Sequence, residues 1–192
     1  MTRNVLLILP ALLCLAAAPA PKTAPAKAPA KAAAAKAPAA AAKPAAPADS
    51  GPFDATNPQA LMGLLSTAGA NVQTKAHEED SVFVTVTSTA ANFSMQFAGC
   101  TPQGRGCKAV LLDSPLDRSS VSGAQVNGFN QTSVLCRVYQ DRAGLAHVLY
   151  SAVLTKTMTR DDGATHLLAW QNCIADGRAF LKDPVAYLAE AA

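Results

Sequence analysis

The sequence predicts an α+β domain, in which an antiparallel sheet packs against an N-terminal helix, a middle helix and a long C-terminal helix. Two patterns lead to this prediction. Apolar and polar residues alternate in several short segments, which is the period of half-buried β-strands. Near the end of the chain, apolar residues instead recur at the helical period over residues 163–181, which is typical of a helix that lies on a sheet.

Residues 1–17 have the pattern of a secretory signal peptide. Arg3 precedes an apolar run that ends at Leu15, and small residues follow. The run is shorter than the ~20 apolar residues that a membrane-spanning helix needs. We therefore expect a periplasmic or secreted protein. A lipoprotein acylated on Cys14 is the alternative, but the bulky Leu13 stands where such signals have a small residue.

Residues 18–50 have the composition of a disordered linker. Positions 19–48 hold 17 Ala, 7 Pro, 5 Lys and 1 Thr, which cannot form a core. Residues 49–192 carry ten basic and thirteen acidic residues, so their net charge is −3 and we expect no nucleic-acid partner. The linker lysines have two interpretations. They keep a spacer solvated, which we favour, or they make a weak contact with an anionic envelope surface.

We expect the folded domain to span residues 51–185 and a C-terminal tail to cover residues 186–192. The first helix of the domain starts at Asn57, a good N-cap, with Pro58 at the first helical position. Gly69 ends this helix after about three turns.

Three strands are predicted after this helix. A less regular strand covers residues 71–76, and two regular strands follow on either side of a turn near residues 88–91. Their apolar residues occupy alternate positions and therefore share one face of a sheet. These residues are Val82, Val84 and Val86 in the first regular strand, and Phe93, Met95 and Phe97 in the second.

A turn-rich connector with a cysteine at each end leads to a further strand over residues 108–113. If Cys100 and Cys107 face each other across this hairpin, the antiparallel register of the two strands follows. The predicted pairs are Phe97 with Val110 and Met95 with Leu112. The register that allows a disulfide therefore also builds one apolar face.

The middle of the domain predicts a polar helix and a second hairpin. The helix covers residues 120–133 and has few apolar positions. The strands of the hairpin cover residues 135–140 and 145–154, with a turn at residues 141–144.

The long C-terminal helix has a clear start and end. Thr159 and Asp162 have the spacing of a capping box, and Asp183-Pro184 stops the helix. At 100° per residue, one arc of the helix is apolar and faces the sheet. This arc contains Leu167, Trp170, Cys173, Ile174, Gly177, Phe180 and Leu181, with Trp170 as a core anchor.

Four cysteines remain beyond the signal peptide, and an even number in an exported chain predicts disulfides. Four cysteines allow three pairings. We favour Cys100 with Cys107, for the reason given above. We also favour Cys136 with Cys173, which would tie a strand to the buried arc of the long helix. The spacings do not match the paired Cys-x-x-Cys ligands of a zinc site, so we expect no metal there.

No segment carries a recognisable catalytic, cofactor-binding or metal-binding motif. The sequence lacks a Gly-rich phosphate loop, a nucleophile elbow and a His-Glu-x-x-His pair. His77 precedes the acidic residues 78–80, where a divalent cation could bind, but we favour a solvated turn. His147 and His166 have no evident partner in the sequence. We therefore expect no cofactor and no enzymatic activity.

Several short motifs occur in order along the domain. They are Leu64-Leu65-x-x-x-Gly69, Phe97-x-Gly99-Cys100 with Cys107-Lys108, Val126-Asn127-x-Phe129-Asn130, Arg137-Val138-Tyr139-x-Asp141-x-x-Gly144, and the Trp170 helix. With these motifs, residues 57–183 resemble the YbjN domain family, described as bacterial sensory-transduction regulators. The resemblance implies a fold similar to that of type III secretion chaperones and a binding or regulatory role. It implies no catalytic residues.

The sequence favours an exported, non-enzymatic protein-interaction or regulatory module of the bacterial envelope, which binds a protein partner through its sheet or a helix face. Two alternatives stay open. The chain could be a structural envelope spacer, in which the linker matters more than the domain. It could instead be a small ligand-binding protein or enzyme with a site near His77, and a deep pocket with converging polar groups would favour that reading.

Overall fold

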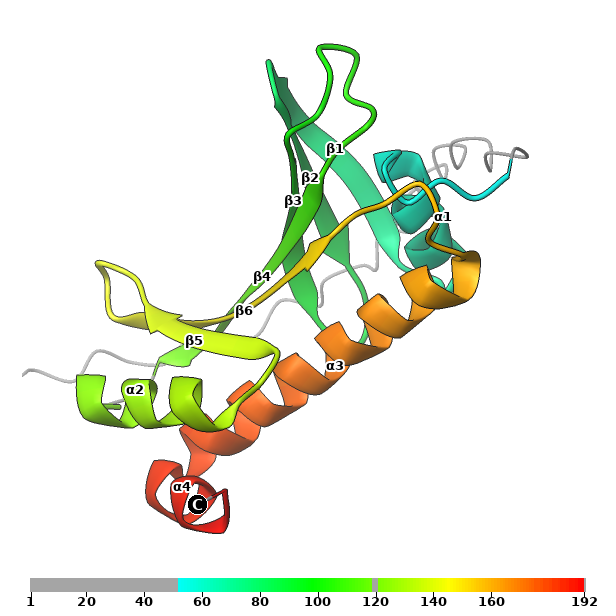
Figure 1. Cartoon of the computed structure of the whole chain (residues 1–192). Helices are drawn as coiled ribbons and strands as arrows, with labels where there is room; N and C mark the ends of the chain where they lie inside the picture. Colours follow the sequence, from blue (N-terminus) through cyan, green and yellow to red (C-terminus); the bar gives the residue numbers. More distant parts are fainter. Residues whose placement is uncertain (1–51, 119–120, 192) are drawn as a thin grey trace, which may run out of the picture. The chain divides into compact units, whose positions relative to one another are not determined.

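The computed structural model describes residues 52–118 and 121–191, which contain six strands and four helices (Figure 1). The predicted signal peptide (1–17) and linker (18–50) lie outside the described residues. None of the helices in the described part of the chain has the length and hydropathy needed to cross a membrane. The elements are α1 (Pro58–Thr67), β1 (Asn71–Glu78), β2 (Ser81–Thr87), β3 (Asn92–Ala98), β4 (Ala109–Arg118), α2 (Gly123–Thr132), β5 (Cys136–Gln140), β6 (Leu145–Val153), α3 (Arg160–Lys182) and α4 (Pro184–Glu190).

All six strands belong to one antiparallel sheet with the order β1-β2-β3-β4-β6-β5. The first four strands follow one another as neighbours. After β4 the chain forms α2 and then β5 at the far edge, and β6 returns between β4 and β5. The predicted α+β class, with an antiparallel sheet and a long C-terminal helix, is therefore confirmed.

The register of the β3–β4 hairpin is the one predicted from its two cysteines. Phe97 pairs with Val110, and Met95 pairs with Leu112. A disulfide joins Cys100 to Cys107 next to this ladder. The six alternating apolar residues of β2 and β3 are all buried on one face of the sheet, which is where the core lies.

Helix α3 covers the buried face of the sheet, and Trp170 is central to this contact. Trp170 is 1% exposed, and its ring meets that of Phe93 edge-on with the centroids 5.4 Å apart. Gly177 lets the helix approach the sheet closely, because a Cβ atom there would lie 2.9 Å from a methyl carbon of Leu116. Trp170 is thus the core anchor that the sequence predicted.

Helix α3 begins at Arg160, three residues earlier than predicted, because the predicted capping box is present. The Asp162 backbone N–H donates to Thr159 Oγ1 at 3.1 Å, and the Thr159 N–H donates to an Asp162 carboxylate oxygen at 2.8 Å. The helix starts directly after this cap. Five of the seven residues in the predicted arc are buried, while Leu167 and Leu181 are half-buried.

The segment expected to be a tail contains the fourth helix, α4. Asp183 ends α3 and also caps α4, since its carboxylate accepts a hydrogen bond from the Ala186 N–H at 3.0 Å. Pro184 occupies the first helical position, as Pro58 does in α1. The Asp183-Pro184 pair both stops one helix and starts the next, so most of residues 186–192 is helical.

Candidate functional site

The face of the sheet opposite α3 is only partly buried. Phe83 of β2, Leu111 of β4 and Leu149 of β6 alternate with core residues and are half-buried. Asp113 and His147 lie two residues further along β4 and β6 and share this face. The face therefore combines apolar positions with a polar end.

At the polar end, His147, Asp113 and Tyr139 form a hydrogen-bonded cluster across β4, β6 and β5. Nδ1 of His147 lies 2.7 Å from Asp113 Oδ1, and Tyr139 Oη donates to Asp113 Oδ2 at 2.7 Å. The rings of Tyr139 and His147 stack with centroids 4.9 Å apart. Burial and the hydrogen bond to Asp113 raise the pKa of Tyr139, so its hydroxyl keeps its proton at neutral pH.

The cluster resembles the base half of a catalytic triad, but its reactive nitrogen is closed off. In a triad, the aspartate orients Nδ1 and the histidine presents Nε2 to a nucleophile. Here Nε2 of His147 is buried without a hydrogen-bond partner, 3.8 Å from Asp141 Oδ2. A substrate cannot reach this atom, so we interpret the cluster as a tie between three strands.

The other two histidines also take no part in a recognisable catalytic arrangement. Nδ1 of His166 lies 2.6 Å from Tyr150 Oη, which joins α3 to β6. His77 is exposed in β1. Within residues 52–118 and 121–191, no group of three or more His, Cys, Asp or Glu side chains could hold a metal ion. The hydrogen-bond partners of His147 and His166 are Asp113 and Tyr150, which lie 34 and 16 residues away in the sequence, so no local pattern revealed them.

The two edges of the sheet are protected in different ways. At β5, the Asn130 side chain donates to the Val138 carbonyl at 3.0 Å and accepts from the Val138 N–H at 2.8 Å. These are the groups that an added strand would bind. At the opposite edge, Lys75 falls where the β1–β2 register shifts, and a bulge with a lysine is a common protection against strand addition. Both edges are therefore protected against pairing with a strand of a partner.

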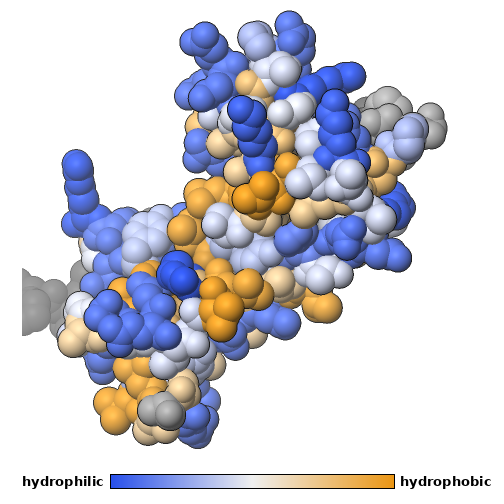
Figure 2. Space-filling view, in the orientation of Figure 1, coloured by the Kyte–Doolittle hydropathy of each residue, from blue (hydrophilic) through white to orange (hydrophobic). Residues whose placement is uncertain are grey.

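The loop between α2 and β5 exposes adjacent apolar side chains. Val134 is 86% exposed and Leu135 is 56% exposed, and Leu168 on α3 is 58% exposed. Figure 2 shows hydrophobic side chains gathered where the start of β5 meets α3. We call residues 133–135 the apolar loop. Contiguous exposed apolar surface is typical of an interaction site.

The apolar loop is held firmly in place. Cys136, at its end, forms a disulfide with Cys173 of α3. The Cys136 N–H donates to Ser133 Oγ at 3.1 Å. The Arg137 guanidinium donates to the carbonyls of Ser133 and Cys136 at 2.8 and 2.7 Å. The exposure of the loop is therefore a fixed feature of the fold.

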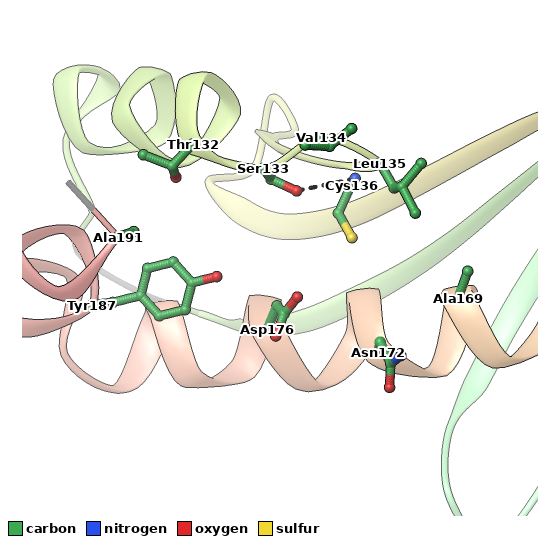
Figure 3. Close-up of a pocket in the computed structure, with 10 residues that line it drawn as sticks. All are labelled: Thr132, Ser133, Val134, Leu135, Cys136, Ala169, Asn172, Asp176, Tyr187 and Ala191. Carbon is green, nitrogen blue, oxygen red and sulfur yellow. Dashed lines mark hydrogen bonds between the residues drawn. The ribbon is translucent and has the colours of Figure 1, made fainter.

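An open groove of about 350 Å³ runs beside the apolar loop, between α2, α3 and α4 (Figure 3). Its upper wall is the apolar loop, and its floor is the outer side of α3. The lining residues are Thr132, Ser133, Val134, Leu135, Cys136, Ala169, Asn172, Asp176, Tyr187 and Ala191. Only Asp176 carries a charge among them.

Tyr187 of α4 and Asp176 of α3 form the polar end of the groove, and Asn172 lies between Asp176 and Ala169 along α3 (Figure 3). The Tyr187 ring stacks on Phe129 with centroids 5.6 Å apart and meets Phe180 edge-on at 5.8 Å, so it is fixed in position. Figure 3 shows its hydroxyl directed toward Asp176. Burial raises the pKa of Tyr187, and the Asp176 charge raises it further.

Sequence reasoning found the four cysteines but not the groove. Both favoured disulfides are present, and Cys136 lines the groove. One signal in the sequence was Val134-Leu135-Cys136, three apolar residues in a row that break the alternation expected of a half-buried strand. The remaining walls come from α3 and α4, which no local pattern connects to this loop.

No family model, no curated protein and no solved structure matches this chain.

Proposed function

We propose that this chain is an exported, non-enzymatic protein-interaction module of the bacterial envelope with a YbjN-like domain, and that its partner docks on the apolar loop. The observation that carries the proposal is the exposure of Val134 and Leu135 on a loop tied down by the Cys136–Cys173 disulfide. Exposed apolar surface is unfavourable in water, and the disulfide prevents this loop from moving to bury its apolar side chains. A partner that covers the loop removes that cost.

Export is supported by the cysteines and by the start of the chain. Two disulfides fit an oxidising, extracytoplasmic environment. Residues 1–17 have the pattern of the signal peptide that would bring the chain there. We therefore expect the partner to be in the same extracytoplasmic compartment.

A binding role, rather than catalysis, is supported by the closed arrangement around His147. It is the histidine closest to a catalytic geometry, and its Nε2 is buried against Asp141. The residues that line the groove include one carboxylate and no histidine, lysine or free thiol.

Site-specific photo-crosslinking in intact cells tests the proposal. A photoreactive residue placed at Leu135 should give a reproducible crosslink to one protein of the envelope. Val153 is the matched control, because it is an apolar residue that is 71% exposed at the end of β6, outside the groove. No crosslink at position 135, or the same products from both positions, would contradict the proposal.

A further inference from the structure

We infer that the groove takes a lysine or arginine side chain from an extended segment of the partner, with apolar residues on either side of that cation. The inference rests on the proposed function and adds the chemical class of the partner. It follows from the charge and the unused polar groups at one end of the groove, together with the apolar surface at the other.

The polar end has acceptors that the fold does not use. The Asp176 carboxylate and the Tyr187 hydroxyl make no hydrogen bond to another described residue, and neither does the side chain of Asn172 further along α3. Asp176 and Asn172 lie one helical turn apart on the exposed side of α3, and the Tyr187 hydroxyl points toward Asp176 (Figure 3). An ammonium or guanidinium group supplies several N–H donors, which suits a carboxylate beside a hydroxyl.

The other end of the groove suits the aliphatic part of the same side chain. Val134, Leu135 and Ala169 are among the residues that line it. Lysine and arginine cover apolar surface with their methylene groups while the charged head reaches a polar site. Leu168, next to Ala169 on α3, extends the exposed apolar surface beyond the groove. This extension favours a polypeptide with flanking apolar residues over a free amine.

The negative charge of Asp176 determines that the preferred side chain is a basic one. Asp176 is the charged group among the lining residues. It would repel an acidic side chain in the groove, and no basic lining residue would offset that repulsion. The nearby Arg137 already donates to the carbonyls of Ser133 and Cys136 and does not line the groove. The groove therefore distinguishes a basic segment from an acidic or a neutral one.

Peptide binding followed by amide chemical shifts tests this inference on the oxidised, purified protein. The probe is the blocked heptapeptide Ala-Leu-Ala-Lys-Ala-Leu-Ala, compared with versions that carry norleucine or glutamate in place of lysine. The lysine peptide should shift the signals of residues 132–136 and 169–176. It should bind about fivefold more tightly than the norleucine peptide, which is the effect of one partly exposed ion pair.

Two variants with the same change of charge locate this preference. Asp176→Asn should abolish the difference between the lysine and norleucine peptides. Asp161→Asn should keep it, because Asp161 is an exposed acid in the first turn of the same helix, outside the groove. Comparing both peptides on both variants isolates the contribution of the Asp176 contact.

Three results would overturn the inference. They are equal binding of the lysine and norleucine peptides, a lysine preference that survives in Asp176→Asn, and the absence of shifts around the groove at millimolar peptide. The proposed function fails on different grounds, namely the lack of a specific crosslink at Leu135. A neutral peptide that binds the groove as well as the lysine peptide would therefore refute the basic segment and leave the docking site in place.

Discussion

The Asn130 side chain takes the place of a neighbouring strand along the outer edge of β5. Its amide group both donates to and accepts from the backbone of Val138, as a residue of an added strand would. An edge residue whose N–H and C=O are satisfied in this way is protected from pairing with another chain. These two hydrogen bonds also hold α2 against β5, next to the apolar loop.

Replacing Asn130 tests this role. Asn130→Ala leaves the Val138 N–H and carbonyl without these partners, so we expect the free energy of unfolding to fall by about 1–3 kcal/mol. The amide hydrogen of Val138 should also exchange faster with solvent. Asn127→Ala is the control, because Asn127 is exposed on the same helix. A loss of stability that is equal in both variants would contradict the role of Asn130.

Two glycines in helices should respond to alanine in opposite ways. At Gly177 a Cβ atom would lie 2.9 Å from Leu116 Cδ1 and 3.3 Å from Val148 Cβ. This crowding outweighs the gain of about 1 kcal/mol in helix propensity, so Gly177→Ala should destabilise the domain by up to about 2 kcal/mol. At Gly63 nothing lies within 4 Å of the added atom. Gly63→Ala should therefore stabilise α1, by up to about 1 kcal/mol. Chemical denaturation measures both, and destabilisation of both by similar amounts would show that the packing of α3 is not the cause.

At the scale of elements, the sequence predicted the features that depend on residues close together in the chain. The arc of α3 follows from periodicity, and the register of β3 and β4 follows from the two facing cysteines together with the apolar alternation. Both are found in the structure. Helix α4 was missed because Asp183-Pro184 serves two helices, and the second is short and gains its packing from Tyr187 against Phe129. Likewise, the groove and the His147 cluster join residues from separate elements, which no single segment can reveal.

The edge strand β1 gives a prediction of its own. Seven of its eight residues are exposed, and Lys75 lies at the register shift in its middle. Removing this charge should make the edge more able to pair with a second copy. We expect Lys75→Val to self-associate at lower concentration than the unsubstituted protein in sedimentation experiments. Lys156→Val, an exposed change outside the sheet, should not. Unchanged association in Lys75→Val would mean that the bulge alone protects the edge.

At the scale of the whole molecule, the charges are divided between two parts of the sequence. Residues 19–48 contain five lysines and no acid, whereas residues 49–192 have a net charge of −3. The basic character of the chain therefore belongs to the predicted linker. The lysines are four to seven residues apart, which is sparser than the clusters that hold proteins on anionic membranes.

Binding to anionic vesicles at two salt concentrations separates the two interpretations of the linker. In low salt, vesicles of phosphatidylglycerol should bind the chain that starts at residue 18, because the attraction of five lysines adds up. The binding should be weak, since each lysine near the surface contributes at most about 1 kcal/mol. At 0.15 M salt the Debye length falls to about 8 Å, and we expect the chain to be released, as a solvated spacer should be. A chain that starts at residue 49 should not bind at either concentration, and its free energy of unfolding should be unchanged. Retention of the longer chain at 0.15 M salt, lost when the five lysines are replaced by glutamine, would instead establish the linker as an adhesive segment.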